Sequence, residues 1–338
     1  MKFKAQLISI ALLFSISNTQ AGNLFSITER GADCLTTTIC DLLEDMVNEI
    51  IPDATTLNFL PEMADAAILA NKGLSTDYAS NVNVFVLGAS LGMGIDLGED
   101  GIGSGTGDGN ATLPAVGIGG TVTLGANMGI FLKGKFWDRS TIYVNYFSYR
   151  LTTGSVSGEL SSFGLHYQFK LLPPINMAAG LIKWGGIDIS TGIETSSTKI
   201  NTQINVDQTV TSGTATASYA GLADVGADIS ATSIPIEVTT NLRVVYALTL
   251  FGGLGFDYNS GTSKSIANIT GPVTLGGTAS GSGSASLDLG KADGPSTTSF
   301  RTIIGAQFNI AAIRLYMQKM AVIGGNDTQL SFGVRFAW

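Results

Sequence analysis

Residues 330–338, the last nine of the chain, constrain its fold most strongly. Apolar residues alternate here with small or polar ones up to the carboxyl end, and these apolar residues are Leu330, Phe332, Val334, Phe336 and Trp338. A period of two predicts a β-strand with one apolar face. A closed barrel in lipid accounts for such a strand, because its apolar face meets hydrocarbon while every backbone group is paired with a neighbouring strand.

This ending resembles the last strand of bacterial outer-membrane β-barrels, which finishes on Phe or Trp with the same alternation. The resemblance implies an outer-membrane location in a Gram-negative (diderm) bacterium, with outer-membrane lipid and the barrel insertion machinery as partners. It also implies that the insertion machinery reads a signal formed by Phe332, Val334, Phe336 and Trp338.

The first 21 residues predict a secretory signal peptide. Lys2 and Lys4 precede an apolar run over residues 7–16, and small or polar residues lead to Ala21. Cleavage would remove two lysines and no acids, which takes the formal charge from −8 to −10. No later apolar run reaches the length of a helical membrane span. Yet the mean hydropathy is +0.30 and only 13% of residues are charged, as expected for apolar residues dispersed over barrel strands.

Residues 22–80 have helical rather than strand periodicity. Apolar residues recur at helical spacing over residues 42–51, acids occupy the first turn, and Pro52 ends the run. A second helix is predicted over residues 61–72, with Gly73 just past its end. Two interpretations of this helical extension stay open. It lies in the periplasm beneath the barrel, or it is a plug inside the lumen.

The only two cysteines, Cys34 and Cys40, lie in the same extension. In an exported protein we expect them to form a disulfide. Two thiols without a nearby histidine make a poor metal site. Neither cysteine stands at the end of the signal peptide, so the sequence predicts no lipid anchor.

From residue 81 to residue 338 the period of two predominates. The candidate strands are residues 82–97, 115–133, 141–151, 160–171, 177–195, 202–219, 234–250, 251–258, 284–289, 300–310, 311–320 and 329–338. With strands of about ten residues, this length predicts an all-β, antiparallel transmembrane barrel of roughly 12 to 14 strands.

One face of several candidate strands is polar. A charge facing lipid at mid-depth costs about 2 to 4 kcal/mol, so we expect these faces to line the lumen. The predicted lumen-lining residues are His166, Gln168, Lys170, Arg243, Arg301, Arg314 and Arg335. Together they predict a cationic interior. Aromatic residues predicted at the membrane interfaces are Trp137, Tyr143, Tyr146, Phe147, Tyr149, Trp184 and Trp338.

Residues 98–110 and 259–295 consist largely of Gly, Ser, Thr and Asp. Such segments bury little apolar surface, so we expect long surface loops.

No motif predicts catalysis, a cofactor or a metal. Residues 88–92 match Gly-x-Ser-x-Gly, but Ser90 lies within a predicted strand and no helix follows, as a nucleophile elbow requires. His166 is the only histidine, and we expect it to line the lumen among other polar residues rather than to act as a general base. The acidic balance and the lack of a basic cluster argue against nucleic-acid binding.

Glycine-interrupted strands in the second half resemble a family of leptospiral surface adhesins. The stretches that carry this resemblance are residues 180–192, 234–253 and 298–305. The resemblance implies a surface-exposed barrel whose loops bind host extracellular-matrix components. A second hypothesis stays open, namely a porin-like channel or transporter for small solutes with a cationic lumen and an N-terminal plug.

Overall fold

The computed structural model describes residues 55–80, 82–96, 115–177, 181–212, 215–275, 278–292 and 294–337. The signal peptide, the first predicted helix, both cysteines, residues 98–110 and Trp338 lie outside these ranges. Statements about them stay predictions. The chain divides into two compact units, one of residues 60–201, 226–264 and 290–338 and the other of residues 1–59, 202–225 and 265–289.

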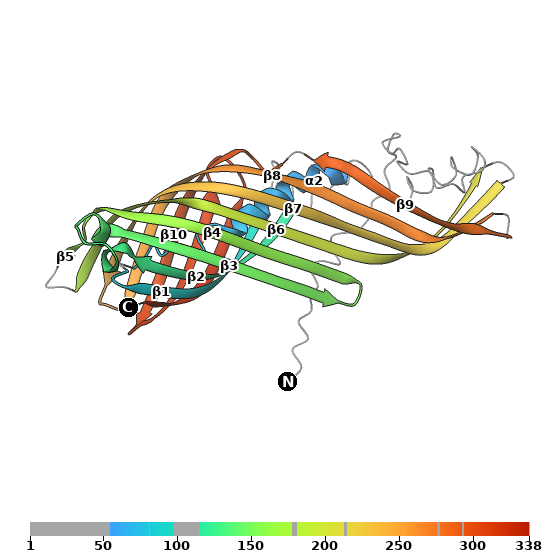
Figure 1. Ribbon diagram of the computed structural model, residues 1–338. Helices are drawn as coiled ribbons and strands as arrows, with labels where there is room; N and C mark the ends of the chain where they lie inside the picture. Colours follow the sequence, from blue (N-terminus) through green and yellow to red (C-terminus); the bar gives the residue numbers. More distant parts are fainter. Residues whose placement is uncertain are drawn as a thin grey trace. The chain divides into compact units, whose positions relative to one another are not determined.

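The described chain consists of one α-helix, two 3₁₀ turns and a series of strands (Figure 1). Their bounds are α2 (Thr55–Asn71), β1 (Phe85–Asp96), β2 (Ala115–Asn127), η2 (Met128–Ile130), η3 (Trp137–Arg139), β3 (Ser140–Thr153), β4 (Val156–Leu172), β5 (Ile175–Met177), β6 (Ile182–Ser212), β7 (Ala215–Val244), β8 (Leu248–Leu275), β9 (Thr278–Ala292), β10 (Thr298–Ile310), β11 (Ile313–Val322) and β12 (Thr328–Ala337). The predicted second helix exists, but it begins at Thr55 and carries Pro61 in its interior rather than in its first turn.

The strands form one 12-stranded sheet that closes on itself. Among the described residues, eleven of these strands follow the order β10-β11-β12-β1-β2-β3-β4-β6-β7-β8-β9, and β8 also pairs with β10. The twelfth, β5, pairs only with β6. The seam between the first and last strands is continuous, since β1 pairs with β12 antiparallel from Val86 opposite Ala337 to Ile95 opposite Thr328. The predicted all-β antiparallel barrel is therefore confirmed, but in the part of the chain that the structure describes eleven strands follow one another in the sheet, one fewer than the lowest number predicted.

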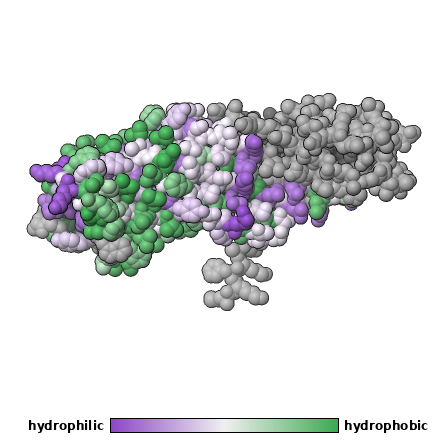
Figure 2. All heavy atoms as spheres, in the orientation of Figure 1, coloured by the Kyte–Doolittle hydropathy of each residue, from purple (hydrophilic) through white to green (hydrophobic). Residues whose placement is uncertain are grey.

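The barrel exposes apolar side chains on its outer surface. In β12 the outward residues Leu330, Phe332 and Phe336 are 48%, 58% and 39% exposed, whereas Ser331 and Arg335 are buried on the inner side. β1 and β2 repeat the alternation. Figure 2 shows apolar side chains gathered over the region in which Figure 1 labels β1 and β2. An apolar exterior around a polar interior is the pattern of a membrane barrel.

Two predicted segments differ from the structure. Residues 259–295 are not a loop over most of their length, because β8 continues to Leu275 and β9 spans Thr278–Ala292. Strand pairing uses backbone hydrogen bonds, so a run of Gly, Ser and Thr can extend an existing ladder without apolar side chains. The candidate strand over residues 234–250 is interrupted by a turn in which Val245 and Tyr246 have positive φ. Valine and tyrosine rarely adopt positive φ, so the sequence does not predict a turn here.

Strands β6, β7 and β8 are unusually long, at 31, 30 and 28 residues. A membrane-spanning strand needs only about 9 to 11 residues. Their distal parts, residues 202–225 and 265–275, belong to the second unit. Within that unit the side-chain amide of Gln203 donates to Asp224 over 3.2 Å.

The two ends of the barrel differ. At one end, called here the turn end, lie the start of β1, the end of β12 and the connections at residues 128–139, 245–247 and 311–312. At the other, called the long-strand end, β6 continues past residue 201 and residues 97–114 connect β1 to β2. No helix among the described residues is long and apolar enough to cross a membrane.

Candidate functional site

The inner surface of the barrel is occupied by residues 62–80, called here the plug. The second half of α2 and the irregular segment after it are almost fully buried, with Ala66, Ala70 and Leu74 at 0 to 1% exposure. The plug contains charged residues buried to the same degree, Lys72 and Asp77, each 1% exposed. Buried charges require partners, which the barrel wall supplies.

The helical part of the plug lies against glycines of β1 and β2, here called the glycine wall. A Cβ atom built on Gly94 or Gly117 would overlap the carbonyl oxygen of Ala66. One built on Gly92 or Gly119 would overlap that of Ala70, the same side of the helix one turn later. Strand glycines of this kind mark close approach of another backbone. The wall is thus shaped to receive this helix.

After Gly73, whose φ of +65° ends the helix, the plug has no regular structure. Its carbonyl groups accept hydrogen bonds from barrel side chains instead. These bonds are Gln329 to Lys72 (2.8 Å), Gln318 to Gly73 (3.2 Å), Ser90 to Leu74 (3.3 Å), Arg335 to Thr76 (2.8 Å), Gln168 to Asp77 (3.4 Å) and Asn241 to Tyr78 (3.0 Å). Buried backbone acceptors need such partners, so the segment is fixed by side chains from five strands.

A cluster of ion pairs joins the plug to β6, β7, β8 and β10, here called the charged wall. Lys72 Nζ lies 3.2 Å from a carboxylate oxygen of Glu194 and 3.2 Å from one of Asp257. Arg301 Nε lies 2.7 Å from Asp257, and its Nη2 lies 2.5 Å from Glu237. The cluster is dry, since Arg301 is 0% exposed.

Hydroxyl groups complete this cluster. The Tyr78 hydroxyl donates to Glu237 at 2.8 Å, and the Ser190 hydroxyl donates to the same carboxylate at 2.7 Å. Lys72 also donates to Ser233. Each of these buried carboxylates therefore has several donors, which offset part of the cost of removing a charge from water.

A second group of contacts holds the plug near the turn end. Asp77 accepts from the backbone N–H groups of Ala79 and Ser80, at 3.1 and 3.0 Å. Its carboxylate also lies 3.3 Å from Arg335 Nη1 and 3.5 Å from Arg314 Nη1. The Arg335 guanidinium lies 3.8 Å from the ring centroid of Tyr316, a cation–π geometry.

The predicted lumen residues occupy the following positions. His166, Gln168, Arg301 and Arg335 are buried on the inner side at 0 to 5% exposure. The Lys170 and Arg314 side chains are 16% and 13% exposed, and Arg243 is partly buried near the turn end of β7.

The expectation of a cationic interior is wrong, because acids accompany these bases. Lys170 lies 2.7 Å from Asp188, and the arginines of β10 and β12 face Glu237, Asp257 and Asp77. Tyr143 is also not an interfacial residue as predicted. It is 0% exposed inside the barrel and donates to Gln168 at 2.6 Å.

Ser90 and His166 do not form a nucleophile and base pair. The Ser90 hydroxyl bonds the Leu74 carbonyl and the Tyr316 hydroxyl. The serine beside His166 is Ser75, whose Oγ lies 2.8 Å from Nε2. Glu194 approaches the same nitrogen at 3.2 Å, whereas in a catalytic triad the acid binds the opposite ring nitrogen. These contacts hold the plug in place.

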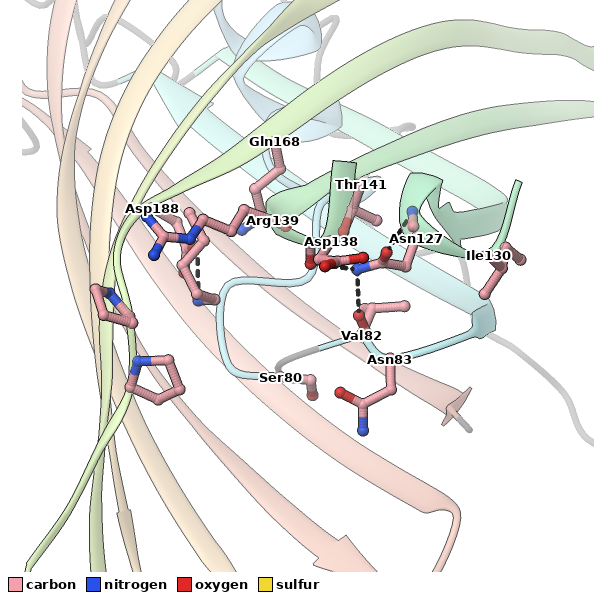
Figure 3. Close-up of a pocket in the computed structure, with 14 residues that line it drawn as sticks. Ser80, Val82, Asn83, Asn127, Ile130, Asp138, Arg139, Thr141, Gln168 and Asp188 are labelled. Carbon is pink, nitrogen blue, oxygen red and sulfur yellow. Dashed lines mark hydrogen bonds and ion pairs between the residues drawn. The ribbon is translucent and has the colours of Figure 1, made fainter. Parts of the chain in front are cut away.

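A cavity of about 500 Å³ lies at the turn end, beside Ser80, the last residue of the plug. Figure 3 shows Asn127 reaching between Val82 and Asp138, whose carbonyl groups accept from its side-chain amide at 3.0 and 3.1 Å. Arg139, Lys170 and Asp188 also line it. Within the described ranges, no three His, Cys, Asp or Glu side chains gather in a metal-binding group.

Sequence reasoning missed the acids of the site and the residues of the plug that meet them. A signal for Glu237 existed, since Ile234, Ile236 and Val238 alternate with it and face outward. The same alternation could have placed Asp257 inward. No signal of this kind identifies Lys72 or Asp77, because neither belongs to a strand.

Solved structures similar to this chain have low sequence identity to it. The translocator domain of the autotransporter NalP from Neisseria meningitidis is 12% identical, with a TM-score of 0.32, over 91% of this chain and 100% of that one. The transport unit of the autotransporter AIDA-I from Escherichia coli is 10% identical, with a TM-score of 0.29, over 83% and 99%. A FadL homologue from Pseudomonas aeruginosa is 8% identical, with a TM-score of 0.24, over 81% and 97%.

At these TM-scores the likeness carries no argument about what this chain does. Among curated proteins none matches it. The family described as Lsa36-like matches residues 4–338, nearly the whole chain. This confirms the predicted resemblance to the leptospiral surface adhesin family. The chain is an outer-membrane β-barrel and belongs to the Lsa36-like family.

Proposed function

We propose that this protein is a surface-exposed adhesin-like scaffold, which presents its loops and strand extensions to host extracellular-matrix components. The observation that supports this function is the occupied lumen. Ion pairs and hydrogen bonds hold residues 62–80 to the wall, so the barrel offers a rigid frame rather than an open pore. Loops on rigid frames commonly bind partners. The proposal assigns no catalytic activity to the protein.

The competing hypothesis is a channel or transporter for small solutes. Solute passage would require the plug to leave the lumen or move within it. Such movement would separate Lys72 from Glu194 and Asp257, and breaking a buried pair is strongly unfavourable. We therefore propose the scaffold as the principal function.

Planar-bilayer conductance separates the two functions. We expect no ohmic conductance from the refolded full-length protein and discrete open-channel steps from a protein that lacks residues 22–80. Steady conductance from the full-length protein at low voltage would overturn the scaffold in favour of the channel.

Binding to immobilised laminin, collagen and fibronectin tests the adhesive part directly. Replacing residues 98–110 by a short Gly-Ser linker should weaken binding to at least one of them tenfold or more. Lys133→Ala, in the exposed β2–β3 connection at the turn end, is the matched control and should leave binding unchanged. Unaltered binding by the loop variant would argue against presentation by that loop.

A further inference from the structure

The direction in which the plug crosses the barrel follows from its contacts with β1. Ala66 lies against Gly94, Ala70 against Gly92 and the Leu74 carbonyl against Ser90. Farther along, Val82 clusters with Val86. As the plug residue numbers rise, the β1 residue numbers fall. The plug therefore runs antiparallel to β1, toward the turn end where β1 begins.

The beginning of the plug consequently lies at the long-strand end. Contacts made by Asp65 agree with this direction. Its carboxylate accepts from the backbone N–H and the hydroxyl of Ser296, at 2.9 and 2.8 Å. Ser296 is exposed and lies two residues before the start of β10, at that end of the barrel. The chain thus enters the lumen at the long-strand end and leaves it at the turn end to form β1.

The two ends can be assigned to the two sides of the membrane. Outer-membrane barrels have short turns on the periplasmic side and longer segments on the extracellular side. Residues 245–247 and 311–312 make tight connections at the turn end. At the other end β6, β7 and β8 continue for two to three times the length that a bilayer requires. The long-strand end is thus the extracellular one.

We infer that the plug is a passage of the chain through its own barrel, which enters from the extracellular side at Glu62 and leaves on the periplasmic side after Ser80. This topology differs from a periplasmic extension, in which the chain would approach the barrel from the turn end. It deepens the proposed function by assigning the end of the barrel that external partners can reach. It rests on the barrel geometry and would stand even if matrix binding failed.

Three epitope insertions in the full-length protein test the inference. One follows Ser26, one follows Gly325 in the β11–β12 turn at the long-strand end, and one follows Ala312 in the β10–β11 turn at the turn end. We expect antibody to bind the first two on intact cells, at least tenfold above the third. The third should react only after the outer membrane is permeabilised.

Each other outcome overturns the inference. Labelling of the Gly325 insertion but not of the Ser26 insertion on intact cells would mean that the N-terminal segment does not reach the surface. Labelling of the Ala312 insertion alone would mean that the barrel has the opposite orientation. Because matrix binding is not measured, neither result bears on adhesion itself.

A measurement on the unmodified protein tests the inference even if the insertion variants misfold. An antiserum raised against a synthetic peptide of residues 22–33 should label intact cells that express the wild-type chain. If it labels them only after permeabilisation, while an antiserum to residues 98–110 labels intact cells, the inference is wrong.

Discussion

The glycine wall and the charged wall hold the same plug by different means. On the glycine wall, β1 and β2 present no side chains where the helix approaches, and Ala66 and Ala70 touch the strand backbone. Across the lumen, Lys72 and Tyr78 meet acidic side chains of β6, β7 and β8, two of which also pair with Arg301 of β10. Close packing on the glycine wall sets the distance between the helix and strands β1 and β2. The charged wall fixes position along the barrel through ion pairs that tolerate few other arrangements.

This difference predicts unequal responses to substitution. Shape complementarity is lost gradually as the helix shifts, whereas a buried ion cluster fails when one member is removed. The largest effect should therefore come from the charged wall.

Arg301→Met breaks the charged wall at its centre. It leaves the carboxylates of Glu237 and Asp257 without their strongest partner in a dry interior. We expect a loss of about 3 to 5 kcal/mol in the free energy of unfolding, measured by urea titration of the refolded barrel in detergent. Arg150→Ala is the matched control, because its pair with Glu159 is solvent-exposed, with the side chains 74% and 44% exposed. It should cost less than about 1 kcal/mol. Equal effects would show that the cluster contributes no more than a surface pair.

Gly94→Ala tests the glycine wall. The added methyl group would overlap the Ala66 carbonyl, so the helix or the strand must shift, at a cost of about 1 to 3 kcal/mol. Gly158→Ala in β4 is the control, since its Cβ would meet only the Lys199 carbonyl, at 3.8 Å. Limited proteolysis should cut the plug faster in the first variant than in the second. No difference in unfolding or proteolysis would mean that the helix is seated by the charged wall alone.

The sequence was sufficient to predict the barrel but not the lumen it encloses. Alternation in 330–338 identified β12 and its inward Arg335, because a strand's two faces follow from its own residues. The same reasoning wrongly predicted a cationic interior, because it overlooked the acids that pair with these bases. The partner of Arg301 is set by pairing among β7, β8 and β10 and by the plug, and such tertiary relations are not encoded in the periodicity of one strand. For the same reason the sequence left open whether residues 22–80 enter the lumen.

Tyr78→Phe should have a smaller effect on the charged wall. The substitution keeps the ring, which lies 6.0 Å from that of Phe251, and removes one hydroxyl donor to Glu237. Arg301 and Ser190 still bind that carboxylate. We expect a loss of about 1.5 kcal/mol, typical of a hydrogen bond to a charged group. Tyr146→Phe, on the outer face and 62% exposed, should be nearly neutral under the same urea titration. A loss as large as that of Arg301→Met would mean that the hydroxyl network, rather than the ion pairs, dominates this wall.

The smallest effect should come from the rim of the glycine wall at the long-strand end, where acidic side chains of the barrel lie near acidic side chains of the plug. Burial, with the carboxylates of Asp96, Asp65 and Glu62 nearby, raises the pKa of Asp327 from 3.8 to about 7. The folded protein then holds a proton between these values that the unfolded chain has released, so stability falls as pH rises from about 4 to 7. Asp327→Asn removes this dependence. Relative to wild type, the melting temperature of this variant should rise progressively between pH 5 and pH 8. The corresponding gain in the free energy of unfolding should stay below about 1 kcal/mol, because the site is half exposed. Asp138→Asn, exposed at the turn end, is the control variant for the same measurement. A pH-independent difference for Asp327→Asn would show that folding does not raise the pKa of Asp327.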